Sequence, residues 1–276
     1  MESRGGSYTI SAMRFAALLV LVAAACESPD FTFRPERVAP GRVVQYVKSN
    51  LDGSKPSLVS LYVADRDRIE VYKSEKGLTD SADVLVHLDW ARFSAARLDA
   101  GVITADGRRE PRAKLDVNGS ELVVRVGNAE QKFEVHTFPL HVYNFDLMSL
   151  NVMLPHLNHP ERSFRVAFAE PTFGTKPQLL ELRGFATARY SGRERVNGTL
   201  TRRYSLAGAG MNGTMWVNMK DGLIQRFESP VPNNPGWNSL RLERRDSHGM
   251  TPEEWRRYKL TRVGKGVGSG RGAGNR

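Results

Sequence analysis

The sequence has only one cysteine, Cys26, among its 276 residues. A single cysteine excludes an intramolecular disulfide and a metal site built from several cysteines of one chain. The chain also lacks a long apolar run. The run made only of apolar residues from Phe15 to Ala25 has 11 residues, whereas a membrane-spanning helix needs about 20. The G-x-S-x-G elbow, the H-E-x-x-H helix and the phosphate-binding lysine loop are absent as well, so no catalytic, cofactor-binding or metal-binding residue is assigned from these motifs.

The first 25 residues have the pattern of an export signal. Arg4 and Arg14 supply positive charge, Phe15 to Ala25 supplies a short apolar region, and small residues stand directly before Cys26. A cysteine at this point resembles the lipobox of bacterial lipoproteins, although Ala23 stands where Leu or Val is usual. The resemblance implies cleavage before Cys26 and lipidation of its sulfur and its new amine. The alternative is an ordinary signal peptide followed by an unrelated cysteine.

This interpretation divides the chain into four parts: a signal peptide (1–25), a lipidated linker (26–33), a single antiparallel β domain (34–263) and a Gly-rich basic tail (264–276) that we expect to be disordered. The residue after Cys26 is Glu27. In enteric bacteria an aspartate at that position retains lipoproteins in the inner membrane. The resemblance therefore favours a lipid anchor in the bacterial cell envelope, in the outer membrane and facing the periplasm.

Acidic residues are the minority: 30 Asp and Glu stand against 40 Lys and Arg, which gives a net charge of +10 and a pI of about 9.9. About +9 of this charge remains after removal of the signal. Nucleic acid is the usual partner of so basic a chain, but export removes that partner. Anionic lipid headgroups or the acidic matrix of the cell envelope are then better candidate partners. The alternative is an arginine-rich composition without a specific role.

Six Asn-Gly or Asp-Gly pairs punctuate the interior, and such pairs favour tight hairpins: 52–53, 106–107, 118–119, 197–198, 212–213 and 221–222. Alternating segments predict strands around and between them: 43–48, 58–63, 69–73, 84–88, 112–117, 121–126, 132–137, 164–169, part of 180–196, 199–206, 213–219, 223–228 and 239–244. Short strands joined by short turns make an antiparallel meander. The predicted fold class is therefore mainly β, a curved antiparallel meander or half-barrel with one or two covering helices.

Two helices are predicted. Thr251, Pro252 and Glu254 form a capping box with proline in the first turn, which begins a helix through Leu260. The second segment, 140–154, carries leucines and a tyrosine at helical spacing and precedes Pro155; a strand followed by a loop is the alternative. An open sheet of this length must curl or be covered. We expect these two helices to cover its open side.

Two motifs could carry chemistry, and both favour a structural interpretation. Gly208 to Gly213 matches G-x-G-x-x-G, but a strand follows it, and a dinucleotide site needs the N-terminus of a helix. Four histidines, His136, His141, His156 and His159, lie close in sequence. The pair His156 and His159 could bind a metal together with Glu161, but flanking prolines favour an extended loop with hydrogen-bonded histidines. A hydrolase using the His136–His159 segment is the less favoured enzymatic alternative.

The C-terminal half contains a series of motifs at 189–192, 194–198, 203–204, 215–217 and 221–228. The series resembles the pattern G-x-E-x-[VI]-[ND]-G, Y, [LM]-W-V and D-G-L-x-x-R-x-E of unclosed-barrel carrier proteins, among them the LolA/LolB-like lipoprotein-localisation factors. The resemblance implies a curved sheet around an apolar cavity, and no ligand-contacting residue carries over. The expected function is a non-enzymatic envelope lipoprotein that binds an apolar or lipid-like ligand. The alternative is a structural or assembly lipoprotein whose core is filled.

Overall fold

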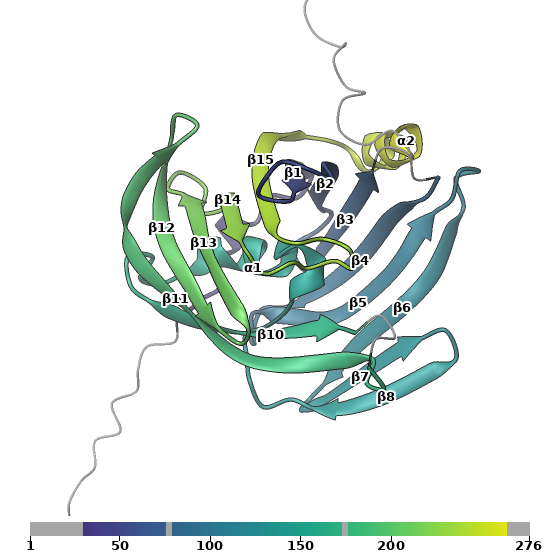
Figure 1. Cartoon of the computed structure of the whole chain (residues 1–276). Helices are drawn as coiled ribbons and strands as arrows, with labels where there is room; N and C mark the ends of the chain where they lie inside the picture. Colours follow the sequence, from purple (N-terminus) through teal and green to yellow (C-terminus); the bar gives the residue numbers. More distant parts are fainter. Residues whose placement is uncertain (1–29, 76–78, 173–175, 264–276) are drawn as a thin grey trace, which may run out of the picture.

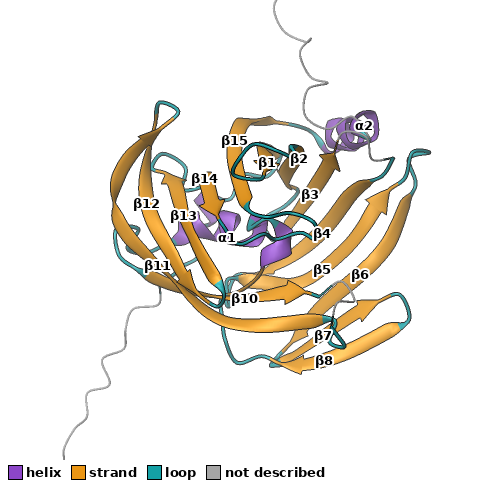
Figure 2. Cartoon of the chain, in the orientation of Figure 1, coloured by secondary structure: helices purple, strands orange, loops and turns teal. Residues whose placement is uncertain are grey.

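The computed structural model describes residues 30–75, 79–172 and 176–263, and this part of the chain forms one sheet of 15 strands (Figures 1 and 2). The strand order is β8-β7-β6-β5-β4-β3-β2-β1-β15-β14-β13-β12-β11-β10-β9. Neighbouring strands are antiparallel, except that β9 is parallel to β10. The sheet curves around helix α1 without closing into a barrel (Figure 1). The predicted mainly β half-barrel is confirmed.

The strands are β1 (Arg42–Ser49), β2 (Ser57–Val63), β3 (Arg68–Glu75), β4 (Ser81–Asp89), β5 (Ser94–Ile103), β6 (Arg109–Asn118), β7 (Glu121–Val126), β8 (Ala129–Glu134), β9 (Leu140–Val142), β10 (Phe164–Pro171), β11 (Leu180–Val196), β12 (Thr199–Gly208), β13 (Met211–Asn218), β14 (Ile224–Ser229) and β15 (Leu240–Gly249). The helices are α1 (Met148–Met153) and α2 (Pro252–Arg262), with short 3-10 turns η1 (Pro35–Arg37), η2 (Tyr143–Phe145) and η3 (Leu154–His156).

Strand β1 joins two meanders in the middle of the sheet. It pairs with β2 on one side and with the last strand, β15, on the other, in a register that places Val47 opposite Glu243. The first and last strands in sequence order are therefore neighbours in the sheet. All strands, both helices and the core residues lie between residues 30 and 263. A chain that begins at residue 27 consequently contains the complete described fold.

Five of the six predicted Asn-Gly or Asp-Gly turns connect consecutive strands, as expected. The sixth prediction is wrong, because Asn212 and Gly213 lie inside β13. The turn before β13 is made by Ala209 and Gly210, which both have positive φ. Gly213 serves another purpose: a Cβ there would lie 2.7 Å from the carbonyl oxygen of Glu228. This glycine therefore permits close approach of two strands rather than a turn.

The predicted strands all correspond to observed strands, although most of their ends differ. The segment 132–137 begins three residues earlier, as β8, and ends at Glu134. The sequence pattern missed β5 entirely, because its inward residues Leu98 and Ala100 alternate with charged and small residues too weakly to be recognised. It also missed β9, which has only three residues.

The helix predicted over 140–154 is wrong as a continuous element. Its first three residues form β9, and the remainder forms η2, α1 and η3. The break falls at Asp146 and Leu147, which have φ values of 54° and 60°, in the left-handed region that interrupts a right-handed helix. The alternative of a strand followed by irregular structure is closer to the observed chain path.

Helix α2 begins as predicted, with Thr251 and Glu254 forming the capping box. Its predicted position on the open side of the sheet is wrong. The indole of Trp255 stacks on Tyr62 at 5.0 Å and packs edge-on against Tyr72 at 6.4 Å. Tyr62 and Tyr72 alternate with the inward residues Leu61 and Val71, so α2 lies on the convex face of the sheet. Of the two predicted covers, the 140–157 segment is the one that lies on the open side.

Candidate ligand-binding site

The concave face is filled at one end by the segment that contains α1. All six residues of α1 are buried, and Leu147 and Leu150 are completely inaccessible to solvent. The buried Asn151 donates to the hydroxyl of Tyr46 at 2.8 Å and accepts from the amide of Ile224 at 2.7 Å. These bonds connect α1 to strands of both meanders. At this end the half-barrel has an ordinary packed core.

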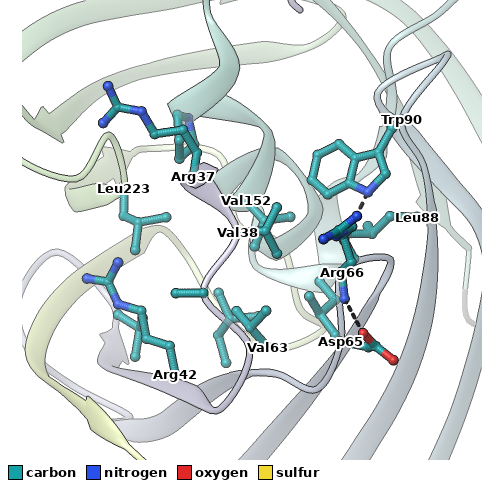
Figure 3. A pocket seen from close by; sticks show the side chains of 15 residues that line it. Arg37, Val38, Arg42, Val63, Asp65, Arg66, Leu88, Trp90, Val152 and Leu223 are labelled. Atoms are coloured by element: carbon teal, nitrogen blue, oxygen red, sulfur yellow. Dashed lines mark hydrogen bonds between the residues drawn. The ribbon is translucent and has the colours of Figure 1, made fainter. Parts of the chain in front are cut away.

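A small hollow beside α1 is shown in Figure 3. It is lined by Val63, Leu88, Trp90, Val152 and Leu223 among others, and its volume is about 30 Å³. Such a space admits one water molecule and excludes an organic ligand. Above it, the indole of Trp90 donates to the carbonyl oxygen of Arg66 at 3.0 Å (Figure 3). The hollow is therefore a packing defect and not a binding site.

A larger cavity lies between strands β3 to β7 and the segments that contain β9, η2 and the ends of β10 and β11; we call it the β3–β7 cavity. Its volume is about 540 Å³, within the range of about 300–1,000 Å³ that small-molecule sites occupy. Its walls are largely aliphatic, and its lining residues are Lys73, Val84, Leu98, Ala100, Arg112, Ala113, Lys114, Leu115, Val124, Val126, Val142, Asn144, Phe145, Pro171, Thr172, Leu179 and Leu180.

A buried ionic cluster adjoins this cavity; we call it the Asp146 cluster. Asp146 is completely buried, and its two carboxylate oxygens bind different lysines: Oδ1 lies 2.8 Å from Lys48 Nζ and Oδ2 lies 2.6 Å from Lys73 Nζ. The side-chain amide of Asn233 donates to Oδ1 at 2.8 Å. Lys73 also donates to the carbonyl oxygen of Asn144 at 2.9 Å. Lys73 and Asn144 line the cavity, so the cluster contacts the cavity through these two residues, and Asp146 itself is not among the lining residues.

The carboxyl group of Asp146 stays ionised within this cluster. Burial alone would raise its pKa, but the ammonium groups of Lys48 and Lys73 outweigh that effect and hold the pKa at about 2. The pKa of Lys48 is lowered because its ammonium is buried, and the attraction of Asp146 opposes this effect. The arrangement is an ion pair at neutral pH.

The four histidines of the 136–159 region do not converge on a common site. His136 is exposed beside Glu134, whereas the buried His141 lies against Ser149 and Phe168. His156 is surrounded by the rings of Phe33, Trp90 and Phe93, and its Nδ1 accepts from the amide of Arg34 at 3.1 Å. His159 lines a separate surface hollow. Within the described residues, no group of three His, Cys, Asp or Glu side chains is placed to bind a metal.

Burial sets the protonation state of two of these histidines. It lowers the pKa of His141 to about 3, and it lowers the pKa of His156 to about 4 with a further contribution from the positive charge of Arg34. Both side chains are therefore neutral at physiological pH. They serve as packing and hydrogen-bonding groups of the core.

Several sequence predictions fall outside the described residues. These are the signal peptide at 1–25, the lipidation site Cys26 and the tail at 264–276. In the part of the chain that the structure describes, neither helix is long and apolar enough to span a bilayer.

Neither protein-family models nor curated proteins match its sequence. The arguments for function below therefore depend on the geometry of the chain itself and on its N-terminal sequence.

Sequence reasoning missed the Asp146 cluster, although two signals for it exist. Lys48 follows Val44 and Tyr46 at the alternate, inward positions of β1, and Lys73 follows Ile69 and Val71 in the same way on β3. A lysine at an inward position requires a buried partner. That partner, Asp146, is the only acidic residue in the apolar segment 140–154.

Proposed function

We propose that the protein is an exported lipoprotein, anchored through Cys26, whose β3–β7 cavity binds an apolar or lipid-like ligand without catalysis. The observation that carries the ligand-binding part is the cavity itself. A largely aliphatic space of about 540 Å³ remains on a concave face whose other end is filled by the segment that contains α1. Apolar cavities of this size inside curved sheets are typical binding sites for hydrophobic small molecules.

The structural alternative accounts for one half of the concave face only. Leu147, Leu150 and Met153 fill the end around α1, as a structural lipoprotein would require. Atoms that line a void lack packing partners, and this reduces the stability of the fold. If the whole interior served stability alone, a fold with the β3–β7 cavity closed would therefore be favoured. The persistence of the cavity beside a filled core favours ligand binding.

The anchor is supported by the N-terminal sequence and by the charge. Four residues separate Cys26 from Phe31, whose ring packs against Phe93 at 5.2 Å and Phe164 at 5.8 Å. A lipid on Cys26 would therefore hold this end of the half-barrel close to the membrane, in our proposal the periplasmic face of the outer membrane. The net charge of +10 is consistent with a surface next to anionic headgroups.

The anchor is tested by replacing Cys26. In cells fed a fatty-acid probe, the wild-type chain should become labelled and should sediment with membranes. The Cys26→Ser variant should lose the label and remain soluble after lysis, because the thioether to the lipid requires the cysteine sulfur. Equal labelling of the two proteins would contradict the anchor.

The cavity is tested by filling it. Ala113 lines the cavity from β6, so Ala113→Phe should place a ring in the space that a ligand would occupy. Native mass spectrometry of residues 27–276, purified from bacteria without detergent, should show bound lipid in the wild type and much less in Ala113→Phe. Ala207→Phe, at an exposed position on β12 that alternates with the inward Leu206, is the matched control and should bind as the wild type does.

Stability measurements complete this test. Filling a cavity with a large ring can cost about 1–3 kcal/mol when the fit is imperfect, so urea unfolding of both variants must show that they are folded. A wild-type protein that neither retains lipid nor binds any added single-chain amphiphile would contradict the proposed function.

A further inference from the structure

The charges that line the β3–β7 cavity have one sign. Of the described lining residues, Lys73, Arg112 and Lys114 are cationic and none is acidic. However, Lys114 alternates with the inward Leu115 and pairs with Asp99, so its charge lies on the convex face. A cavity meant for a neutral hydrocarbon needs no charged wall, since charged groups near an apolar space lose hydration. The distribution indicates a ligand that combines an apolar part with a negative charge.

The three cations differ in how well they are neutralised and shielded. Arg112 and Lys114 have largely exposed side chains, and each has a carboxylate nearby: Glu110 at 3.1 Å from Arg112, and Asp99 at 3.9 Å from Lys114. Lys73 is mostly shielded from solvent, with 18% of its side chain exposed. Its carboxylate partner, Asp146, is shared with Lys48.

The ammonium group of Lys73 keeps bonding capacity toward the cavity. A lysine ammonium has three N–H donors, and its partners among the described residues are Asp146 Oδ2 and the carbonyl oxygen of Asn144. The third donor is available to a ligand. In so shielded a position, a hydrogen bond to an anion is stronger than the same bond in water.

The shape of the cavity matches an elongated ligand. Its wall includes residues of five adjacent strands, from Lys73 on β3 to Val126 on β7. Strands lie about 4.8 Å apart, so this wall extends over roughly 19 Å. Lys73 marks one end, and Val126, whose side chain is partly exposed, marks the other. The intervening lining residues Val84, Leu98 and Leu115 are aliphatic.

We propose that the ligand is a single-tailed anionic amphiphile, with a carboxylate or phosphate head bound by Lys73 and an alkyl tail lying along β4 to β7. This inference rests on the proposed ligand-binding function and specifies the chemical class of the ligand. The positive charge of Lys73 selects the head group, and the aliphatic wall accommodates the tail.

The test compares amphiphiles that share one tail and differ in head group. Residues 27–276, stripped of bound lipid, are titrated by calorimetry with laurate, dodecyl phosphate, dodecanol and dodecyltrimethylammonium below their micellar concentrations. Laurate, dodecyl phosphate or both should bind, and the cationic amphiphile should not. Comparison of the two anions distinguishes a carboxylate ligand from a phosphate ligand.

The role of Lys73 is tested with Lys73→Met, which keeps the length of the side chain and removes its charge. The affinity for the anionic amphiphile should fall about ten-fold or more, the effect of losing one charge-assisted hydrogen bond, while dodecanol should bind as before. Lys73→Arg should retain the preference for anions. Lys132→Met is the matched control, because Lys132 lies on β8, exposed and paired with Glu121 outside the cavity.

The outcomes separate the two proposals. Equal binding of laurate and dodecanol by the wild type would overturn the anionic head group and leave the apolar site intact, and this comparison needs no variant. Loss of the anion preference in Arg112→Gln but not in a folded Lys73→Met would also overturn the assignment to Lys73. Failure of every amphiphile to bind would overturn the proposed function together with this inference.

Discussion

The carboxylate of Asp146 illustrates how single residues organise the interior. It is completely buried, yet it holds two lysines that come from different strands, β1 and β3. Removing one member of such a group leaves an uncompensated charge and costs about 3–5 kcal/mol. Its φ of 54° is accessible to aspartate at a small cost. Asp146 therefore ends η2 and positions the lysine that faces the cavity.

His141 and His156 give the protein a predicted sensitivity to mild acid. Their pKa values in the folded state are lowered to about 3 and about 4, below the usual value of about 6.5 in an unfolded chain. The unfolded state therefore binds more protons as the pH falls below 6.5. The free energy of unfolding is therefore highest above a pH of about 6.5. It decreases below that pH until the pKa of the folded state is reached.

The decrease should approach about 1.4 kcal/mol per pH unit for each histidine once the pH is well below 6.5. It can be measured by urea unfolding between pH 7.5 and 4.5, above the range in which most carboxylates titrate. His141→Asn and His156→Asn keep an acceptor near the position of Nδ1 and cannot be protonated. Each should flatten the pH dependence, whereas His136→Asn, at an exposed position, should not. An unchanged slope in both core variants would contradict this prediction.

The elements that the sequence predicts best are those defined by local rules. Helix α2 has its cap, its proline and its acidic first turn within four residues, and it begins where those residues place it. Strand β7 matches its predicted bounds, because a tight Asn-Gly turn and clear alternation mark it. Local rules do not say which face an element covers. Helix α2 was therefore predicted on the wrong side of the sheet, since the outward pair Tyr62 and Tyr72 becomes a docking surface only once β2 and β3 are paired.

The segment 140–157 shows the limit of periodicity as a guide. Leucines at helical spacing occur there, but the same spacing is satisfied by a short strand, two 3-10 turns and a six-residue helix that are buried on several sides. Burial from all sides removes the polar face that distinguishes a surface helix. The long-range contacts that decide the path of this segment, such as Asn151 with Tyr46 and Ile224, are invisible in a single sequence.

At the scale of the whole molecule, the resemblance implies a cavity, but the residue pattern by itself does not decide between a cavity and a filled core. The pattern indicated a curved sheet that needs a cover, and that expectation is confirmed. Whether the interior is filled or hollow depends on how the 140–157 segment packs, and the structure shows both conditions side by side. Leu150 fills one end, and the β3–β7 cavity remains at the other. Lys73 is able to contact a ligand only because it lies between the filled end of the interior and the β3–β7 cavity.

The continuous sheet predicts that the two meanders unfold together. Chains of this length often divide into domains with separate transitions, but here β1 pairs with β15 over eight residue positions, and one core cluster contains residues of both meanders. Neither half can lose its structure without exposing the apolar face of the other.

The four tryptophans provide probes on both sides, with Trp90 between β4 and β5 and Trp216 on β13. With fluorotryptophan incorporated, fluorine NMR should show the native signals of Trp90 and Trp216 disappearing at the same urea concentration, after assignment by single Trp→Phe replacements. Two distinct midpoints would mean that the seam between β1 and β15 joins independent domains, and the 34–263 region would no longer be one folding unit.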